Sequence, residues 1–87
     1  MTAIEKYVKN GVIVQMPRKL DDKRAVFLYA ADMFEADRTY TEKEVNELLK
    51  KIYPDYALLR RYLVDFKLLG RDNGGTIYRK NSAVVNV

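Results

Sequence analysis

The sequence contains no cysteine and no histidine, and its 87 residues include a single serine, Ser82. Because zinc sites of the finger or hydrolase type need thiolate or imidazole ligands, the sequence excludes them. The same absences exclude a cysteine nucleophile, a histidine general base and a Ser-His-Asp arrangement. The only glycine pair, Gly74-Gly75, lacks the Lys-Ser/Thr and the helix that follow a phosphate-binding loop. We therefore expect no enzyme, no cofactor and no metal site.

Long hydrophobic runs are also missing, since no apolar stretch approaches the roughly 20 residues of a membrane-spanning helix. The first ten residues carry Glu5, Lys6 and Lys9 in place of the apolar core of a secretory signal. Without cysteine there is no disulfide and no indication of export. The sequence thus predicts a cytoplasmic protein that does not associate with membranes.

What the sequence does have is an excess of positive charge, with 16 Lys and Arg against 12 Asp and Glu, a formal net charge of +4. Residues 55–80 hold six of the basic groups and three of the acidic ones, so most of the excess lies in this segment. Such an asymmetry favours a polyanionic partner such as nucleic acid.

The N-terminal part predicts a short β-hairpin. Residues 7–9 and 12–14 are strand-like and flank Asn10-Gly11, a pair that tolerates the positive φ angles of a tight type I′ turn. A connector is expected next, because Pro17 disfavours helix at the residue before it.

Helical periodicity then predicts a first helix, which Asp21 or Asp22 would cap and which ends near residues 35–37. A short extended link over residues 38–40 is expected to follow. The core-facing positions of this helix are Val26, Phe27, Ala30, Met33 and Phe34.

A second helix is predicted from a capping box, in which the Thr41 hydroxyl accepts from the backbone of Glu44 and the Glu44 side chain accepts from the backbone of Thr41. Apolar residues then recur at spacings of three and four at Val45, Leu48, Leu49 and Ile52. Pro54 ends this pattern, and Asp55 suits the positive pole of a new helix.

The third helix is predicted over residues 55–67. At 100° per residue its core-facing side chains are Tyr56, Leu59, Tyr62, Leu63 and Phe66. The opposite side carries Ala57, Arg60, Arg61, Val64 and Lys67, so the two arginines are expected to point outward.

A second hairpin is predicted from strand-like residues 68–72 and 76–79 around the turn signal of residues 73–75. The tail, residues 81–87, could add a strand or be frayed. The fold class expected is α+β: a winged helix-turn-helix of three helices and a C-terminal hairpin wing, with an extra N-terminal hairpin. The whole chain, 1–87, is predicted as one domain, with the first hairpin in 1–15 and the tail in 81–87.

In a helix-turn-helix the second helix of the pair enters the major groove of DNA. Arginine can grip a phosphate or read guanine with two parallel hydrogen bonds, and the wing would reach the flanking backbone. The candidate nucleic-acid-binding residues are Arg60, Arg61, Lys67, Arg71, Arg79 and Lys80. The alternative for Arg60 and Arg61 is a solvated helix face that pairs with Asp55 or Asp65.

Three other side chains leave alternatives open. Tyr40 and Tyr78 could be partly exposed and stack on bases, or could pack at the edge of the core. Asn46 could be a buried hydrogen-bonding residue that fixes the packing of the second helix against the wing, or a surface residue.

The sequence resembles a bacterial family known as domain of unknown function 2087, over about residues 16–80. The motifs that carry the resemblance are Met16-Pro17-Arg18-Lys19, Tyr40-Thr41-Glu42-Lys43-Glu44-Val45-Asn46, Asp55, Leu59-Arg60-Arg61-Tyr62-Leu63-Val64-Asp65, Arg71, Gly75 and Tyr78-Arg79. Members of that family occur alone or joined to helix-turn-helix regulator domains, so the resemblance implies a role in transcription. It implies no biochemical activity, and a fused domain could equally be the effector or pairing half of a regulator.

The function expected is therefore that of a DNA-binding regulatory module, which a homodimer on two half-sites would strengthen. The alternative is a protein-interaction module that binds a regulator protein and no nucleic acid. RNA binding is less favoured, because the aromatic-rich strands of the common RNA-binding sheet domain are absent. The two main hypotheses differ in one respect, since a DNA groove binder needs Arg60, Arg61, Arg71 and Arg79 on one continuous face.

Overall fold

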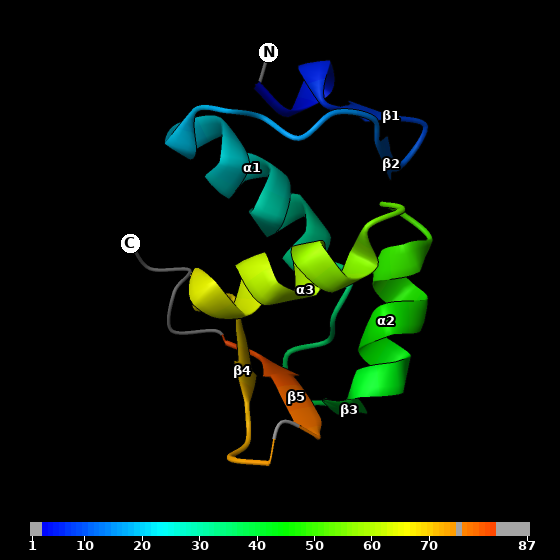
Figure 1. Cartoon of the computed structure of the whole chain (residues 1–87), viewed down its shortest axis with the longest axis vertical. Helices are drawn as coiled ribbons and strands as arrows, with labels where there is room; N and C mark the ends of the chain where they lie inside the picture. Colours follow the sequence, from blue (N-terminus) through cyan, green and yellow to red (C-terminus); the bar gives the residue numbers. More distant parts are fainter. Residues whose placement is uncertain (1–2, 75, 82–87) are drawn as a thin grey trace.

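Three α-helices and two small antiparallel sheets make up residues 3–74 and 76–81, which the computed structural model describes. The helices are α1 (Leu20–Ala31), α2 (Glu42–Lys50) and α3 (Tyr56–Asp65), and a 3-10 turn, η1, spans Ala3–Lys6. The strands are β1 (Val8–Lys9), β2 (Val12–Ile13), β3 (Thr39–Thr41), β4 (Leu69–Arg71) and β5 (Ile77–Lys80). In Figure 1, α3 crosses the middle of the molecule, with α1 and the β1–β2 hairpin on one side and the three-stranded sheet on the other. The α+β class is thus confirmed.

The first hairpin forms as the Asn-Gly pair predicts. Asn10 and Gly11 have φ angles of 53° and 82°, and the strands on either side pair as Val8 with Ile13 and Lys9 with Val12. The hairpin is also held to the rest of the chain, because the buried Ile13 donates its N–H to the carbonyl of Ile52 at 2.7 Å. Residues 3–13 therefore pack on the end of α2 as well as on α1.

Helix α1 differs from the prediction at both ends. Its N-cap residue is Lys19, which has no capping side chain, and Asp21 and Asp22 lie in the first turn instead. In this position the two carboxylates interact favourably with the positive end of the helix dipole, but neither caps the helix with a side-chain hydrogen bond to its backbone. The helix ends at Ala31, four residues before the expected region.

The core-facing positions of α1 are largely as expected, with Val26, Phe27 and Ala30 buried. The Phe27 ring stacks on Tyr62 with centroids 5.0 Å apart and meets Phe66 edge-on at 4.9 Å. Aromatic pairs of this geometry add to the free energy of burial. They fix α3 against α1, and thereby orient the opposite face of α3.

Helix α2 begins with the capping box that the sequence predicts. The Thr41 hydroxyl accepts from the Glu44 N–H at 3.2 Å, and the Thr41 N–H donates to the Glu44 carboxylate at 2.9 Å. That backbone donation is the main reason why the pKa of Glu44 lies below its ordinary value, and the positive charge of Arg38 adds to the effect. The confirmed capping box sets where β3 ends and α2 starts.

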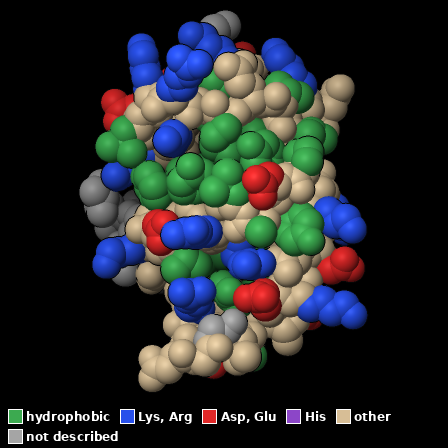
Figure 2. Space-filling view, viewed as in Figure 1, with side chains coloured by type: hydrophobic (Ala, Val, Ile, Leu, Met, Phe, Trp, Pro, Cys, Tyr) green, Lys and Arg blue, Asp and Glu red, His purple; other side chains and the backbone are tan. Residues whose placement is uncertain are grey.

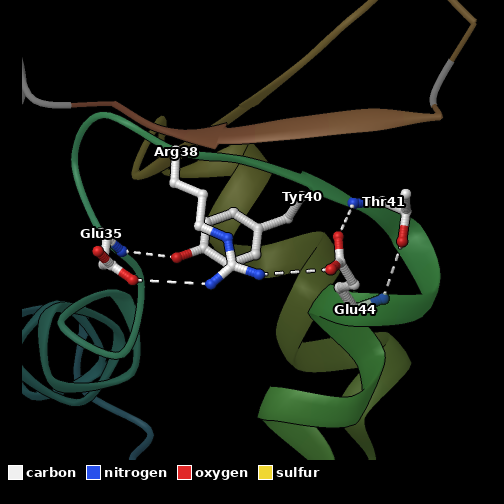
Figure 3. Close-up of polar contacts among 5 residues, drawn as sticks. All are labelled: Glu35, Arg38, Tyr40, Thr41 and Glu44. Atoms are coloured by element: carbon white, nitrogen blue, oxygen red, sulfur yellow. Dashed lines mark hydrogen bonds and ion pairs between the residues drawn. The ribbon is translucent and has the colours of Figure 1, made fainter.

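An arginine holds the loop before α2 in place (Figure 3). The Arg38 guanidinium lies 3.6 Å from the Glu35 carboxylate and 3.4 Å from that of Glu44. It also lies over the Tyr40 ring, 4.7 Å from the centroid. Each contact is partly exposed and therefore individually weak, but the three together fix one conformation of the loop.

Helix α3 is shorter than predicted. Asp55 is its N-cap and accepts from the Leu58 N–H at 3.2 Å, while the last helical residue is Asp65. Lys67 lies beyond the helix in a left-handed conformation with a φ of 63°. The N–H of Leu68 then donates to the carbonyl of Leu63 at 2.8 Å, which ends the helix in a Schellman motif.

The second hairpin forms as predicted, and β3 joins it to give a sheet of order β3-β5-β4. Tyr40 pairs with Tyr78 across β3 and β5, and Tyr78 pairs with Arg71 across β5 and β4. Tyr40, Tyr78 and Leu69 are buried, so one face of the sheet packs against the helices. Asn81 follows β5 and donates its N–H to the carbonyl of Leu68 at 2.9 Å. The rest of the predicted tail, residues 82–87, lies outside the described residues.

One core joins these elements, with the buried positions Ile13, Val26, Phe27, Ala30, Ala31, Phe34, Tyr40, Val45, Leu49, Ile52, Leu59, Leu63, Leu68, Leu69 and Tyr78. Residues from all three helices and both sheets contribute to it. Over residues 3–74 and 76–81, none of the helices has the length and apolar character needed to cross a membrane.

Candidate nucleic-acid interface

A groove of about 630 Å³ lies between α3 and the β4–β5 hairpin. Its lining residues are Ala57, Leu58, Arg60, Arg61, Val64, Asp65, Arg71 and Tyr78. Three arginines therefore face one aspartate around the groove. Figure 2 shows the same face, where Lys and Arg side chains lie among a few Asp and Glu side chains below a band of hydrophobic ones.

Arg61 and Arg71 approach the groove from opposite walls, one on α3 and one on β4. Both are exposed, and no hydrogen bond or ion pair to either side chain is found within residues 3–74 and 76–81. Their guanidinium groups are therefore available for a ligand. A planar guanidinium presents five N–H donors and binds a phosphate or a carboxylate in two-point fashion.

Arg60 behaves differently from the prediction, which placed it outward beside Arg61. Its side chain is only 21% exposed, its Nη1 donates to Oδ1 of Asn46, and its Nε lies 4.0 Å from the Glu42 carboxylate. The residues that hold it are thus on α2, and neither Asp55 nor Asp65 pairs with it in the part of the chain that the structure describes.

Asn46 is half-buried, and its acceptor bond to Arg60 settles the alternatives that the sequence left open. It joins α2 to α3, whereas the sequence suggested packing against the wing. A half-buried guanidinium needs such partners, because an unpaired charge at that depth is costly.

The two tyrosines that were considered for base stacking are buried, Tyr40 at 2% and Tyr78 at 0% exposure. The Tyr40 hydroxyl accepts from the Glu35 N–H at 2.8 Å, and the Tyr78 hydroxyl donates to Glu42 at 2.9 Å. Exposed stacking on bases is therefore wrong for both. Tyr78 lines the groove despite its burial, and its hydroxyl holds the Glu42 carboxylate.

The remaining predicted residues do not join the groove. Arg79 pairs with Gly70 and Thr39, so it lies on the sheet face opposite to Tyr78 and Arg71. Lys80 lies 3.5 Å from Asp32, at the end of α1. The predicted set of six basic residues therefore divides among separate surfaces.

Lys67 is also separate, because it follows α3 in the left-handed turn and does not line the groove. The DNA-binding hypothesis requires Arg60, Arg61, Arg71 and Arg79 on one continuous face, and the structure meets this requirement only in part. Arg60, Arg61 and Arg71 share one groove, and Arg79 lies on another face.

One residue at this site was not found from the sequence. Glu42 stands in the first turn of α2 and contacts both Arg60 and Tyr78, which follow it by 18 and 36 positions. Nothing in the local pattern links such distant positions. The only signal was that Glu42 is an acidic residue in the first turn of a helix. The helix dipole is enough to explain an acidic residue there, so this signal did not point to a contact with Arg60 or Tyr78.

The fold and the groove define a small α+β domain with an arginine-lined groove between a helix and a hairpin. A family model described as "Uncharacterized protein conserved in bacteria (DUF2087)" matches residues 12–80, and the chain belongs to this family. The match begins four residues before the region of resemblance identified from the sequence. Comparison with curated proteins and with solved structures gives no match.

Proposed function

We propose that this protein is a DNA-binding module of the winged-helix type that acts in transcription regulation. The order of elements from α1 to β5 supports the proposal, because helix, strand, helix, helix, strand, strand is the winged-helix order. In this arrangement α2 and α3 form the helix-turn-helix and β4–β5 forms the wing.

The observation that carries the proposal is that Arg61 and Arg71 lie on opposite walls of one groove. One comes from the helix that would enter the major groove, and the other comes from the wing. A phosphodiester backbone that runs between helix and wing would lie between the two guanidinium groups. Such contacts set the position of the protein on DNA and do not themselves read sequence.

The surface of α3 beside the groove is suited to a close approach. Ala57 and Val64 line the groove with short side chains, so the helix backbone can come near to base edges. Arg61 is the exposed residue of α3 that could donate two hydrogen bonds to a guanine. In this proposal Arg61 and Arg71 both contact the backbone, and any base contacts come from α3.

Fluorescence anisotropy of labelled double-stranded DNA at several salt concentrations tests the proposal. The wild type is expected to bind and to weaken steeply with salt. Arg61→Ala and Arg71→Ala should each lower the affinity and reduce the slope of log K against log salt by about 0.9.

Two matched controls remove the same charge elsewhere. Arg79→Ala changes the neighbouring strand on its other face, and Arg24→Ala changes an exposed position of α1. Both controls should keep the wild-type slope. Equal losses in Arg71→Ala and Arg79→Ala would contradict a groove-specific contact, and no binding by the wild type at low salt would end the DNA proposal.

A protein-interaction module is the second candidate, and the outer face of the sheet favours it. A hollow of about 260 Å³ is lined there by Gly70, Ile77 and Arg79, together with Asp72 and with Arg71, which also lines the groove on the other side; Ile77 is 36% exposed. A regulator protein could cover such a surface. Under this hypothesis Arg79→Ala would lower the affinity for that protein, and DNA would not bind.

A homodimer on two half-sites belongs to the first proposal, since a single small domain offers few phosphate contacts. Size-exclusion chromatography with light scattering measures the mass of the free protein and of its DNA complex. A protein that stays monomeric in both states would remove the dimer from the proposal.

A further inference from the structure

Glu42 contacts two residues that line the groove, Arg60 and Tyr78, and Asn46 contacts the same arginine. The Glu42 carboxylate accepts from the Tyr78 hydroxyl at 2.9 Å and lies 4.0 Å from Nε of Arg60. Asn46 accepts from Nη1 of the same arginine. The buried Tyr78 thus holds Glu42, and the half-buried Asn46 holds Arg60.

These contacts involve two of the three nitrogen atoms of Arg60: Nη1 donates to Asn46, and Nε lies near the Glu42 carboxylate without a hydrogen bond. A two-point contact needs two neighbouring nitrogen atoms of the guanidinium, and it must therefore include Nε or Nη1. Both atoms face groups on α2, although Arg60 also lines the groove. A phosphate that binds Arg60 in this way would compete with Asn46 for Nη1 or with the charge of the Glu42 carboxylate near Nε.

Glu42 is held at its position by interactions other than the one with Arg60. It stands in the first turn of α2, where the helix pole favours a negative charge. The capping role in this turn belongs to Glu44, so Glu42 is not needed to close the helix. Its side chain extends toward α3 and β5 instead, where it contacts Arg60 and Tyr78.

We propose that the Glu42 carboxylate competes with a phosphate ligand for Arg60, an arginine that lines the groove. This inference rests on the proposed function. The free protein presents Arg61 and Arg71, and a third phosphate contact forms only when a phosphate displaces the Glu42 carboxylate from Arg60.

Glu42→Gln tests the proposal, because glutamine keeps the size of the side chain and an acceptor for the Tyr78 hydroxyl but has no charge. The slope of log K against log salt for double-stranded DNA is expected to steepen by about 0.9, which corresponds to one additional phosphate contact. At about 50 mM salt the affinity should rise by roughly tenfold. Glu47→Gln, an exposed position of the same helix, removes an equal charge and should leave the slope unchanged.

Arg60→Ala, alone and combined with Glu42→Gln, completes a double-mutant cycle. In the wild-type background this change should alter the slope by much less than Arg61→Ala does, because Glu42 holds Arg60. With Arg60→Ala already present, Glu42→Gln should no longer steepen the slope, which separates the pair from a general effect of charge. Urea unfolding of each variant shows which ones are folded under the binding conditions.

The outcomes separate this inference from the proposed function. A wild type that binds DNA and a Glu42→Gln variant with the same slope would overturn the competitor and leave the groove as a DNA site. Binding that appears only in Glu42→Gln would support the inference strongly. If neither protein binds DNA at low salt, both the proposed function and the inference fail.

Discussion

Replacement of Lys67 by glycine is expected to stabilise the protein. Lys67 follows α3 with a φ of 63°, a region where the β-carbon of an L-residue approaches the following carbonyl oxygen. Its N–H donates to the carbonyl of Val64 at 3.0 Å, and the next residue, Leu68, closes the Schellman motif on Leu63. Glycine is the usual residue at this position of the motif, because it has no β-carbon.

The magnitude follows from two opposing effects. The left-handed conformation costs an L-residue about 1–2 kcal/mol. Glycine relieves this strain but loses more backbone entropy on folding, which offsets roughly 0.5–1 kcal/mol. The net gain in the free energy of unfolding for Lys67→Gly is therefore about 0.5–1 kcal/mol. In a domain of this size, 1 kcal/mol raises Tm by about 4–8 °C.

Urea unfolding and thermal scans measure this gain, and Lys67→Ala is the matched control. Alanine removes the same charge and the same side-chain stem, yet it keeps the β-carbon. Lys67→Gly should thus be more stable than both the wild type and Lys67→Ala. Equal stability of the two variants would refute the assignment of strain to the left-handed turn. Because Lys67 does not line the groove, both variants should keep the wild-type salt slope for DNA.

Three further predictions concern stability. Thr41→Ala should lower the free energy of unfolding by about 1 kcal/mol because it removes the capping hydroxyl, and Thr41→Ser should restore most of it; equal urea midpoints would contradict the role of the capping box. The lowered pKa of Glu44 means that its stabilising contribution is complete above the pKa of the unfolded state and is lost as the pH falls through the pKa of the folded state. Glu44→Gln, which keeps an acceptor for the Thr41 N–H, should therefore flatten the acid limb of the urea midpoint against pH, and an unchanged limb would refute this. Gly11→Ala should cost about 1–2 kcal/mol, because Gly11 has a φ of 82°; a midpoint like that of the wild type would show that the turn relaxes.

The helices and hairpins could be predicted because each is specified by neighbouring residues. The capping box at Thr41 and the Asn10-Gly11 turn need only a few positions of the chain, and both are confirmed. Helix ends depend on weaker local signals. Lys67 shows this, since a lysine at the end of an apolar periodicity extends the predicted helix by two residues beyond Asp65.

The partners of the arginines could not be predicted in the same way. Helical periodicity placed Arg60 and Arg61 together on the outer side of α3, and the groove does contain both. Periodicity gives the direction of a side chain but not what a neighbouring helix places against it. Asn46 and Glu42 on α2 cover Arg60, and that contact depends on how α2 and α3 pack.

The positions of the wing residues could have been predicted better, because side chains alternate between the two faces of a strand and the prediction did not use this alternation. Successive residues of a strand point to opposite faces, so Arg79 and Lys80 could not both face the DNA from one wing. The pairing of Arg71 with Tyr78 shows on which face of the sheet the Arg71 side chain lies, since a residue directly opposite a buried tyrosine shares its face. Alternation along β5 thus separates Arg79 from the groove, and the register of the hairpin brings Arg71 to it. The groove contains fewer basic residues than the six predicted: one arginine from each wall, and a third whose side chain contacts Asn46 and Glu42 on α2.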